Sequence, residues 1–596
     1  MDRSNRSAAA RTRRCRGSWL GIGLGLSLLA ASRIAAQDQD FARVRGLGGT
    51  LDDGVAGLAV DGGGNLYVTG SFEGTVDFDP GSGSYPLTAV PNTYIPDAFV
   101  WKLDAAGGLV WARRMGGFEA DGGAGIALDG EDNVYTVGSF HNTADFDPDP
   151  AVTYTLGAGG GGQSKAFVSK LDASGSFVWA KSVGEFNDAY GASIAVDAAG
   201  SVLVAGGFRG TADFDPDPGT SYVLDAGPED DAFILKLDRD GRFAWAKRVG
   251  GTYHTAGMDL ALDGQGNVYA TGYFSATVDF DPGPGSFTLT SAINLAEVFV
   301  LKLDAAGNFV WARRLGGGRD DVGYAIAVDA EGNVLVTGYF QDTADFDPDP
   351  VNVYPLTTAG YYTTFVCKLD GAGSFLWAKS LGGTGTSIGV ELALDGVNNV
   401  YVAGSFNVIT DFDPGPGSYV LNGGYEDGFV WKLASDGRFV WARGVGGASG
   451  DRAGAVTVDA LGEVHVAGSF EGTADFVSGP GRATLTSAGD SDAFVLDLWQ
   501  TPTIRFSDKT SATWTPLFGE AGYNVYRSPS GLPGTFECLA SHRIVPGFDD
   551  PEVPASDTLF AYLTTTVNAA GQEGSFGRQA EFGTPTLERP NSTPCP

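Results

Sequence analysis

Short apolar segments rich in Val, Phe and Trp alternate with turn residues along most of the chain. In the segment 309–317, Phe309, Trp311 and Leu315 fall on one face of an extended strand, and Val310 and Ala312 fall on the other. A strand that is apolar on both faces is covered on both faces, as in sheets that stack against neighbouring sheets. With almost no long helical pattern to compete, this periodicity predicts an all-β fold.

The apolar segments belong to a unit that recurs along the chain. Its most regular part reads Ala-Val-Asp-x-x-Gly-Asn-Val-x-Val-x-Gly-x-Phe, and the Asp of this part stands at positions 61, 129, 197, 263, 329, 395 and 459. In the fifth copy the conserved segments are 325–340, 343–348, 365–370 and 375–383. We therefore expect seven copies of one structural unit.

Each copy holds two tight-turn signals of the form Asp-x-x-Gly-Asn/Ser, at 329–333 and 370–374 in the fifth copy. This chemistry is typical of a hairpin with glycine in the left-handed conformation. Two hairpins make four strands, and four-stranded units at this period are typical of β-propeller blades.

The count of strands predicts how the array closes. The Trp-bearing fourth strand occurs only six times after its own hairpin, because the seventh copy stops at Trp499. Residues 41–49, FARVRGLGG, align without a gap with the fourth strand at 309–317. We expect this N-terminal strand to complete the last blade, since closure removes the exposed sheet edge. Residues 37–499 are thus predicted to form a seven-bladed propeller.

The segments VDAEGNVLVTGYF, Phe-Val-x-Lys-Leu-Asp and FVWARRLGG resemble the SBBP β-propeller repeat family of bacterial exported proteins. The resemblance implies the propeller fold. It implies little about activity, because the family is defined by its architecture and has no shared catalytic motif to transfer.

Residues 1–36 have the pattern of a cleaved signal peptide. An arginine-rich start precedes the apolar segment 19–31, and Ile34-Ala35-Ala36 offers a cleavage site before Gln37. No other segment is long and apolar enough to cross a membrane. We therefore expect export without membrane insertion.

Beyond Trp499 the repeat is replaced by a different pattern. The segments TWTP, YNVYRS and YLTTTVNAAGQEGSFG resemble a fibronectin type III module, which implies a β-sandwich over 500–589 before the Pro-rich tail 590–596. In an exported protein Cys538 and Cys595 are candidate disulfide partners, and two free thiols are the alternative.

Composition and charge exclude several classes of partner. The 596 residues carry 72 Asp and Glu against 38 Lys and Arg, a net charge of −34, which argues against nucleic acid or an anionic membrane surface as partner. Four His and four Cys leave little material for zinc or iron–sulfur sites, and no familiar catalytic motif occurs.

The sharpest candidate chemistry is an Asp-x-Asp-Pro turn that recurs in six copies. Carboxylates at this spacing suit a hard cation such as Ca²⁺, the only cofactor that the sequence indicates; the alternative is that the first Asp caps a turn. The candidate ligands are Asp77, Asp79, Asp145, Asp147, Asp213, Asp215, Asp279, Asp281, Asp345, Asp347, Asp411 and Asp413.

Basic residues also recur, as a lysine on the third strand and Arg or Lys on the fourth. They could line a channel and bind an anion, but structural ion pairs with the repeated Asp residues are the better explanation. The most variable stretch of each copy lies between the Asp-Pro turn and the third strand, where ligand specificity is expected. It contains Tyr94, Gly159–Gly162, Asp230, Asn294, Tyr361, Tyr362 and Tyr425.

Together these features predict a secreted, monomeric, non-enzymatic binding or scaffold protein. Its ligand, a glycan or a protein, would be bound by the variable propeller loops. The alternative is an extracellular lyase or hydrolase acting on polysaccharide, because propellers also host enzymes.

Overall fold

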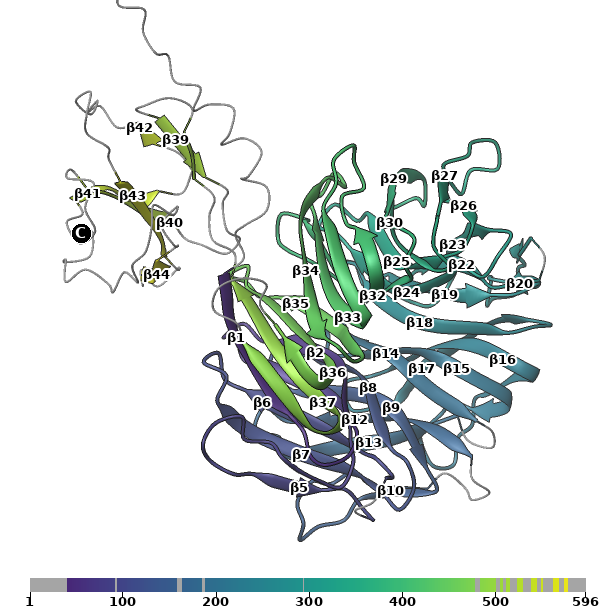
Figure 1. Ribbon diagram of the computed structural model, residues 1–596. Helices are drawn as coiled ribbons and strands as arrows, with labels where there is room; N and C mark the ends of the chain where they lie inside the picture. Colours follow the sequence, from purple (N-terminus) through teal and green to yellow (C-terminus); the bar gives the residue numbers. More distant parts are fainter. Residues whose placement is uncertain are drawn as a thin grey trace, which may run out of the picture. The chain divides into compact units, whose positions relative to one another are not determined.

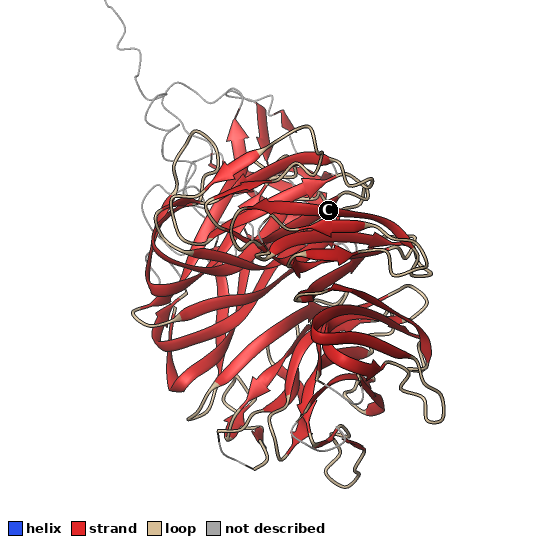
Figure 2. Ribbon diagram, turned by 90° about the vertical axis from the view of Figure 1, so that its right-hand side faces the viewer, coloured by secondary structure: helices blue, strands red, loops and turns tan. Residues whose placement is uncertain are grey.

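A computed structural model describes residues 40–499, apart from 92–93, 158–162, 185–187, 293 and 477–482. For residues 40–42 and 499, and for strands between 504 and 576, only the backbone is described. Every regular element in these parts is a β-strand (Figure 2), so the all-β prediction is confirmed. The predicted signal peptide, 1–36, lies outside the described residues.

A four-stranded antiparallel sheet is the repeating unit, and units are numbered here in chain order. In unit five, β24 (Val322–Val328), β25 (Val334–Phe340), β28 (Thr363–Leu369) and β29 (Phe375–Ser380) pair in that order. The turns Asp329–Asn333 and Asp370–Ser374 join the two hairpins, with Gly332 and Gly373 at φ 82° and 78°. The predicted glycine-containing hairpin turns are therefore present.

The same order of pairing recurs in the other units. Unit one contains β2 (Asp53–Val60), β3 (Leu66–Phe72), β6 (Asp97–Leu103) and β7 (Leu109–Gly117). Unit two contains β8 (Gly122–Leu128), β9 (Val134–His141), β12 (Ser164–Leu171) and β13 (Phe177–Val183). Unit three contains β14 (Ala189–Val196), β15 (Val202–Asp213), β16 (Val223–Leu237) and β17 (Phe243–Gly251).

The later units follow the same plan. Unit four contains β18 (Thr255–Leu262), β19 (Val268–Phe274), β22 (Glu297–Leu303) and β23 (Phe309–Gly317). Unit six contains β31 (Ser387–Leu394), β32 (Val400–Asp411), β33 (Val420–Leu433) and β34 (Phe439–Gly447). The last copy supplies only β35 (Asp451–Val458), β36 (Val464–Asp475) and β37 (Thr484–Trp499).

The strand β1 (Asp40–Leu47) pairs antiparallel with β37, with Val44 opposite Leu496 and Leu47 opposite Ala493 (Figure 1). It occupies the fourth-strand position beside β37, and unit seven is therefore defined here as β35, β36, β37 and β1. Because β1 covers the edge of β37, the backbone groups on that edge are paired.

The hydrophobic core lies between neighbouring units. One cluster joins Tyr269 and Val300 of unit four to Phe340 and Phe365 of unit five. Another joins Leu66 and Phe72 of unit one to Ala493 and Val495 of unit seven, the last in the chain. Apolar residues on both faces of each sheet are thus buried by the sheets on either side.

Two repeated features bring the backbones and the units close together. A Cβ on Gly338 would collide with the carbonyl oxygen of Val322, and the same holds at the equivalent glycine of every unit, which explains why this position excludes side chains. The indole N–H of Trp311 donates to the carbonyl of Gly371 in the next unit, at 3.2 Å. The tryptophans therefore hold adjacent units together.

A set of short strands was not expected from the repeat. In unit five β26 (Thr343–Asp345) pairs with β27 (Pro355–Thr357) and also with β23 of the preceding unit, where Gly316 lies opposite Asp345. The other short strands are β4 (Thr75–Asp77), β5 (Pro86–Thr88), β10 (Thr143–Asp145), β11 (Thr155–Gly157), β20 (Thr277–Asp279) and β21 (Thr288–Thr290). A Cβ on Gly317 would collide with the carbonyl of Thr343, so the diglycine admits this extra strand. By contrast, β30 (Gly382–Gly383) is the end of the predicted segment 375–383 and pairs with β32.

Beyond residue 499 the described backbone forms two further antiparallel sheets. One contains β38 (Ile504–Phe506), β39 (Ser511–Trp514) and β42 (Phe548–Asp549). The other contains β40 (Gly522–Ser528), β41 (Glu537–Arg543), β43 (Ala561–Val567) and β44 (Glu573–Phe576). The side chain of Cys538 and all of Cys595 lie outside the described residues, and so the disulfide stays a prediction.

Candidate functional site

The Asp-x-Asp-Pro turns use their carboxylates as hydrogen-bond acceptors for the backbone. Oδ1 of Asp345 accepts the N–H groups of Asp347, at 3.1 Å, and of Tyr354, at 2.8 Å. Phe346, between the two carboxylates, is 1 % exposed and packs edge-on against Phe340. The motif thus anchors a core phenylalanine and caps its turn; calcium binding by the same carboxylates stays a prediction.

The five other turns repeat this geometry. In each, Oδ1 of the first Asp accepts a backbone N–H two residues on and another eight or nine residues on. The first carboxylates concerned are Asp77, Asp145, Asp213, Asp279 and Asp411, and their second carboxylates are Asp79, Asp147, Asp215, Asp281 and Asp413. The donated N–H groups, chiefly that of Tyr85, lower the pKa of Asp77.

The repeated lysines form ion pairs with the aspartates of the first hairpin turn. Lys368 Nζ lies 2.8 Å from Asp329 Oδ2, which also accepts a hydrogen bond from the Asn333 side chain. Equivalent pairs join Lys170 to Asp129, Lys236 to Asp197 and Lys432 to Asp395. The structural interpretation of these lysines is confirmed in four units.

A group of tyrosines departs from this repeated framework and forms a surface across units three to five. Ring centroids lie 6.0 Å apart between Tyr324 and Tyr339, 4.5 Å between Tyr339 and Tyr362, and 4.6 Å between Tyr361 and Tyr362. Burial is the main cause that raises the pKa of Tyr324, and the charges of the neighbouring Tyr273 and Tyr362 raise it further. The tyrosine surface is defined here as Tyr190, Tyr273, Tyr324, Tyr339, Tyr361 and Tyr362.

Polar groups flank the tyrosine surface in unit three. Burial is the main cause that raises the pKa of Tyr190 to about 12, with smaller contributions from the charges of Tyr273 and Asp230. Arg209 Nε lies 2.9 Å from Asp230 Oδ1, and the exposed His254 ring lies 3.3 Å from the same carboxylate. Aromatic faces with hydroxyls at their edges and charged groups beside them are typical of binding surfaces.

The structure brings together only some of the variable-stretch residues predicted to bind ligand. Tyr361, Tyr362 and Asp230 lie in or beside the tyrosine surface, whereas Tyr94 and Tyr425 are exposed on units one and six. Asn294, in unit four, adopts φ 59° in its loop. Gly159–Gly162 lie outside the described residues.

Four members of the tyrosine surface were missed by sequence reasoning. Tyr273 and Tyr339 stand just before the strand phenylalanine, where the other units carry Ser or Gly. Tyr324 occupies the bulge of its first strand, where three of the other units carry Ala. These residues could have been found from the sequence as positions where one or two units carry tyrosine and most of the others do not.

A pair of acids in the first strands of units four and six was also missed. Asp259 of β18 accepts hydrogen bonds from the Ser193 hydroxyl, at 2.6 Å, and from the Ile326 N–H, at 2.8 Å, and so it connects three units. Burial raises the pKa of Asp259, and burial together with Asp259 raises the pKa of Glu391 in β31. Two interacting carboxyl groups with raised pKa values are typical of functional sites.

Comparisons with known proteins agree with the repeated sheets. The sequence model of the SBBP β-propeller repeat matches residues 310–339. The chain is 24 % identical over 449 residues to the uncharacterized WD repeat-containing protein L264 of Acanthamoeba polyphaga mimivirus, covering 65 % of this chain and 32 % of that protein. The protein is thus a propeller-type repeat protein.

Two further proteins resemble parts of this chain. The regulatory protein FlaEY of Caulobacter vibrioides is 25 % identical over 308 residues, covering 49 % of this chain and 31 % of FlaEY. The chain therefore spans about a third of the length of each of these two relatives. The structure of Sqt1 from Chaetomium thermophilum covers 78 % of this chain with a TM-score of 0.35 and 9 % identity.

The described residues form no helix that is long and apolar enough to cross a membrane.

Proposed function

We propose that this chain is an exported, non-enzymatic binding or scaffold protein whose ligand, a protein or a glycan, contacts the tyrosine surface. The observation that carries the proposal is the packing of the Tyr339 ring between those of Tyr324 and Tyr362, tilted against the first and edge-on to the second. The equivalent position is Ser or Gly in five units, so the repeated fold does not require an aromatic ring there. A cluster that the fold does not need is best explained by recognition.

The same proposal includes the architecture that presents this surface. The seven four-stranded units, with β1 as the last strand of unit seven, would form a closed seven-bladed propeller. In support, the first strands contact one another in the order β2, β8, β14, β18, β24, β31 and β35, and β35 contacts β2. The signal peptide would direct export, and the tail would add a fibronectin-type module.

Binding arrays test the proposal. The mature chain, residues 37–596, is screened against glycan and protein arrays, and each ligand found is measured with the double variant Tyr339→Ser, Tyr362→Ser. We expect the variant to lose at least tenfold in affinity, because tyrosine is among the residues that contribute most of the binding energy at interfaces. The matched control, Tyr425→Ser, removes an equally aromatic but isolated exposed ring on unit six. Equal affinity of the double variant and the control would refute the proposed surface.

The acid pair favours a second candidate function, hydrolysis or elimination on a polysaccharide. Asp259 and Glu391 would act as base and acid, because their interaction separates their tendencies to hold a proton. Incubation with a panel of polysaccharides tests this function. Turnover that is abolished in Glu391→Gln and retained in Glu331→Gln, an exposed control in unit five, would establish an enzyme.

A further inference from the structure

Unit seven alters the polar cluster that the other units share. In units one to six, Asn or Ser stands four residues after the aspartate of the first hairpin turn, and Tyr or Leu stands six residues after it. A lysine of the third strand lies opposite that Tyr or Leu. Unit seven instead has Asp459, Glu463, His465 and Asp497 at these positions. Two side chains that donate protons to the aspartate have been replaced by carboxylates.

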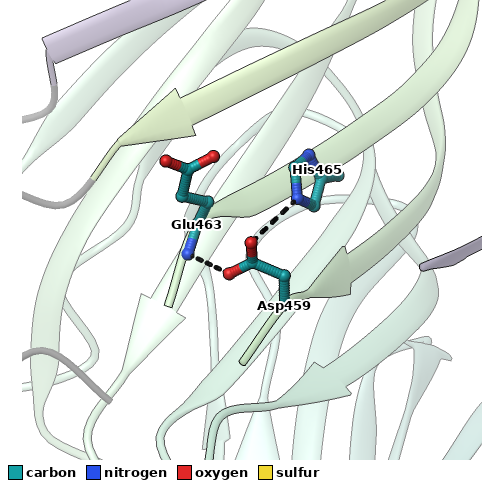
Figure 3. A group of neighbouring side chains, drawn as sticks. All are labelled: Asp459, Glu463 and His465. Atoms are coloured by element: carbon teal, nitrogen blue, oxygen red, sulfur yellow. Dashed lines mark hydrogen bonds and ion pairs between the residues drawn. The ribbon is translucent and has the colours of Figure 1, made fainter. Parts of the chain in front are cut away.

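The side chains of Asp459 and Glu463, at the two ends of the hairpin turn, lie close to that of His465 in β36 (Figure 3). Ligand atoms of Asp459, Glu463 and His465 all lie within 4.8 Å of one another. Asp459 Oδ1 accepts the backbone N–H groups of Leu461, at 2.9 Å, and of Glu463, at 2.7 Å, which fixes the orientation of this carboxylate. Its Oδ2 lies 3.8 Å from His465 Nε2, beyond hydrogen-bond distance.

The two ring nitrogens of His465 are held differently: Nδ1 is hydrogen-bonded, whereas Nε2 makes only the longer ion pair with Asp459. Its side chain is 2 % exposed, and its Nδ1 lies 2.6 Å from Asp497 Oδ1. Its buried Nε2 has no hydrogen-bond partner among the described residues, and it faces Asp459. A buried nitrogen without a partner is costly unless something binds it.

The surroundings match the outer shell of a metal-bound histidine. A carboxylate on Nδ1 fixes the tautomer that presents Nε2 as a ligand. Asp497 is itself paired with Arg43, at 2.5 Å, and Arg45, at 3.1 Å, and so it serves as an orienting group rather than a ligand. Asp459 and Glu463 then supply the negative charge that a cation needs.

We propose that Asp459, Glu463 and His465 bind one divalent first-row transition metal ion of the Zn²⁺ class. One imidazole and two carboxylates form a mixed nitrogen and oxygen set, which suits Zn²⁺ better than Ca²⁺, because Ca²⁺ takes six to eight oxygen ligands. The ion supplies the positive charge beside Asp459 that lysine supplies in units two, three, five and six.

Metal titration tests the site. The mature protein is treated with chelator, and Zn²⁺ is added while bound metal and melting temperature are measured. We expect one Zn²⁺ per chain with micromolar or tighter affinity and a rise in melting temperature, since a ligand specific to the folded state stabilises it. Failure of Zn²⁺ to bind would overturn the proposal and leave His465 as a structural replacement for the lysine.

Two variants replace site residues by those that other units carry at the same positions. His465→Tyr and Glu463→Asn should each weaken Zn²⁺ binding at least 100-fold, whereas His254→Ala, which removes an exposed histidine beside Glu229 and Asp230, should leave it unchanged. Loss of binding in His254→Ala with retention in His465→Tyr would refute the site. X-ray absorption of the wild-type zinc complex gives a test that does not depend on variant folding: one imidazole with oxygen ligands is expected, and a shell of oxygen alone would contradict it.

Discussion

Arg45 of β1 and Asp497 of β37 form an ion pair, Nη1 to Oδ2 at 3.1 Å, although 452 residues separate them in the sequence. The Arg45 side chain is 9 % exposed and that of Asp497 is fully buried. Arg45 Nη2 also donates to the carbonyl of Ala106, in the second hairpin of unit one, at 2.9 Å. One side chain therefore connects the beginning of the chain to its last repeat and to its first.

Removal of residues 40–49 should lower the melting temperature and promote aggregation. The deletion exposes the apolar edge of β37 and removes the two arginines paired with the buried Asp497, which then retains His465 as a partner. Removal of one partner of a buried ion pair costs about 3–5 kcal/mol. Calorimetry and size-exclusion chromatography measure both effects. Deletion of residues 37–39 alone serves as the control, and a monomeric 40–49 deletion that melts like the wild type would contradict this role of β1.

Stability and binding should depend on different aromatic residues. Trp311 is 7 % exposed and connects unit four to unit five, so Trp311→Ala should cost about 3–5 kcal/mol of unfolding free energy in denaturant titrations. The double variant Tyr361→Ser, Tyr362→Ser should change that free energy by about 1 kcal/mol or less, since Tyr361 is 67 % exposed. A reversed order of the two losses would show that the tyrosine surface is part of the core.

Stability should fall as the pH rises from 5 to 8. Burial raises the pKa of Asp53, Asp121, Asp321 and Asp451 to about 7 from an ordinary value near 3.8. Between these two values the folded state holds protons that the unfolded chain has released, so each rise in pH within this window favours unfolding. Melting temperatures at constant ionic strength measure the slope.

A sister unit provides the matched variant for this pH dependence. Asp321 immediately precedes β24 and lies four residues after Gly317, and unit six has Ser387 at the same distance after Gly383. Asp321→Ser should therefore fold and show a shallower decline in melting temperature. A wild-type protein that is more stable at pH 8 than at pH 5 would show that these carboxyl groups ionise normally.

Millimolar Ca²⁺ should leave the melting temperature unchanged if the Asp-x-Asp-Pro carboxylates act only as turn caps. We expect this result, because Oδ1 of each first Asp already accepts two backbone N–H groups. Binding at 100 times the Kd would instead add about 2.7 kcal/mol to the stability. Melting in chelator and in Ca²⁺, with Asp347→Asn as a comparison, separates the two outcomes, and a Ca²⁺-dependent rise lost in that variant would establish the ion.

The sequence by itself determined the strand unit, its hairpins and the core positions. Alternation along a strand is a local property, so the spacing of residues such as Phe309 and Trp311 places them on one face whichever strand pairs with theirs. The repeats then strengthened the strand prediction, because every unit packs against its neighbours in the same way and therefore has the same hydrophobic pattern. The gap-free alignment of residues 41–49 with 309–317 also pointed to the position of β1 on β37, which the structure records.

Tertiary structure alone decided which side chains from different strands, loops and units meet. Tyr324, Tyr339 and Tyr362 come from three strands or loops of one unit, and Asp259 reaches Ser193 and Ile326 of two others. The short strand at Thr343–Asp345 exists because a diglycine of the preceding unit admits its backbone. Local periodicity does not predict such contacts, because they depend on the distance between atoms that are far apart in the sequence. Only the packing of neighbouring sheets sets that distance.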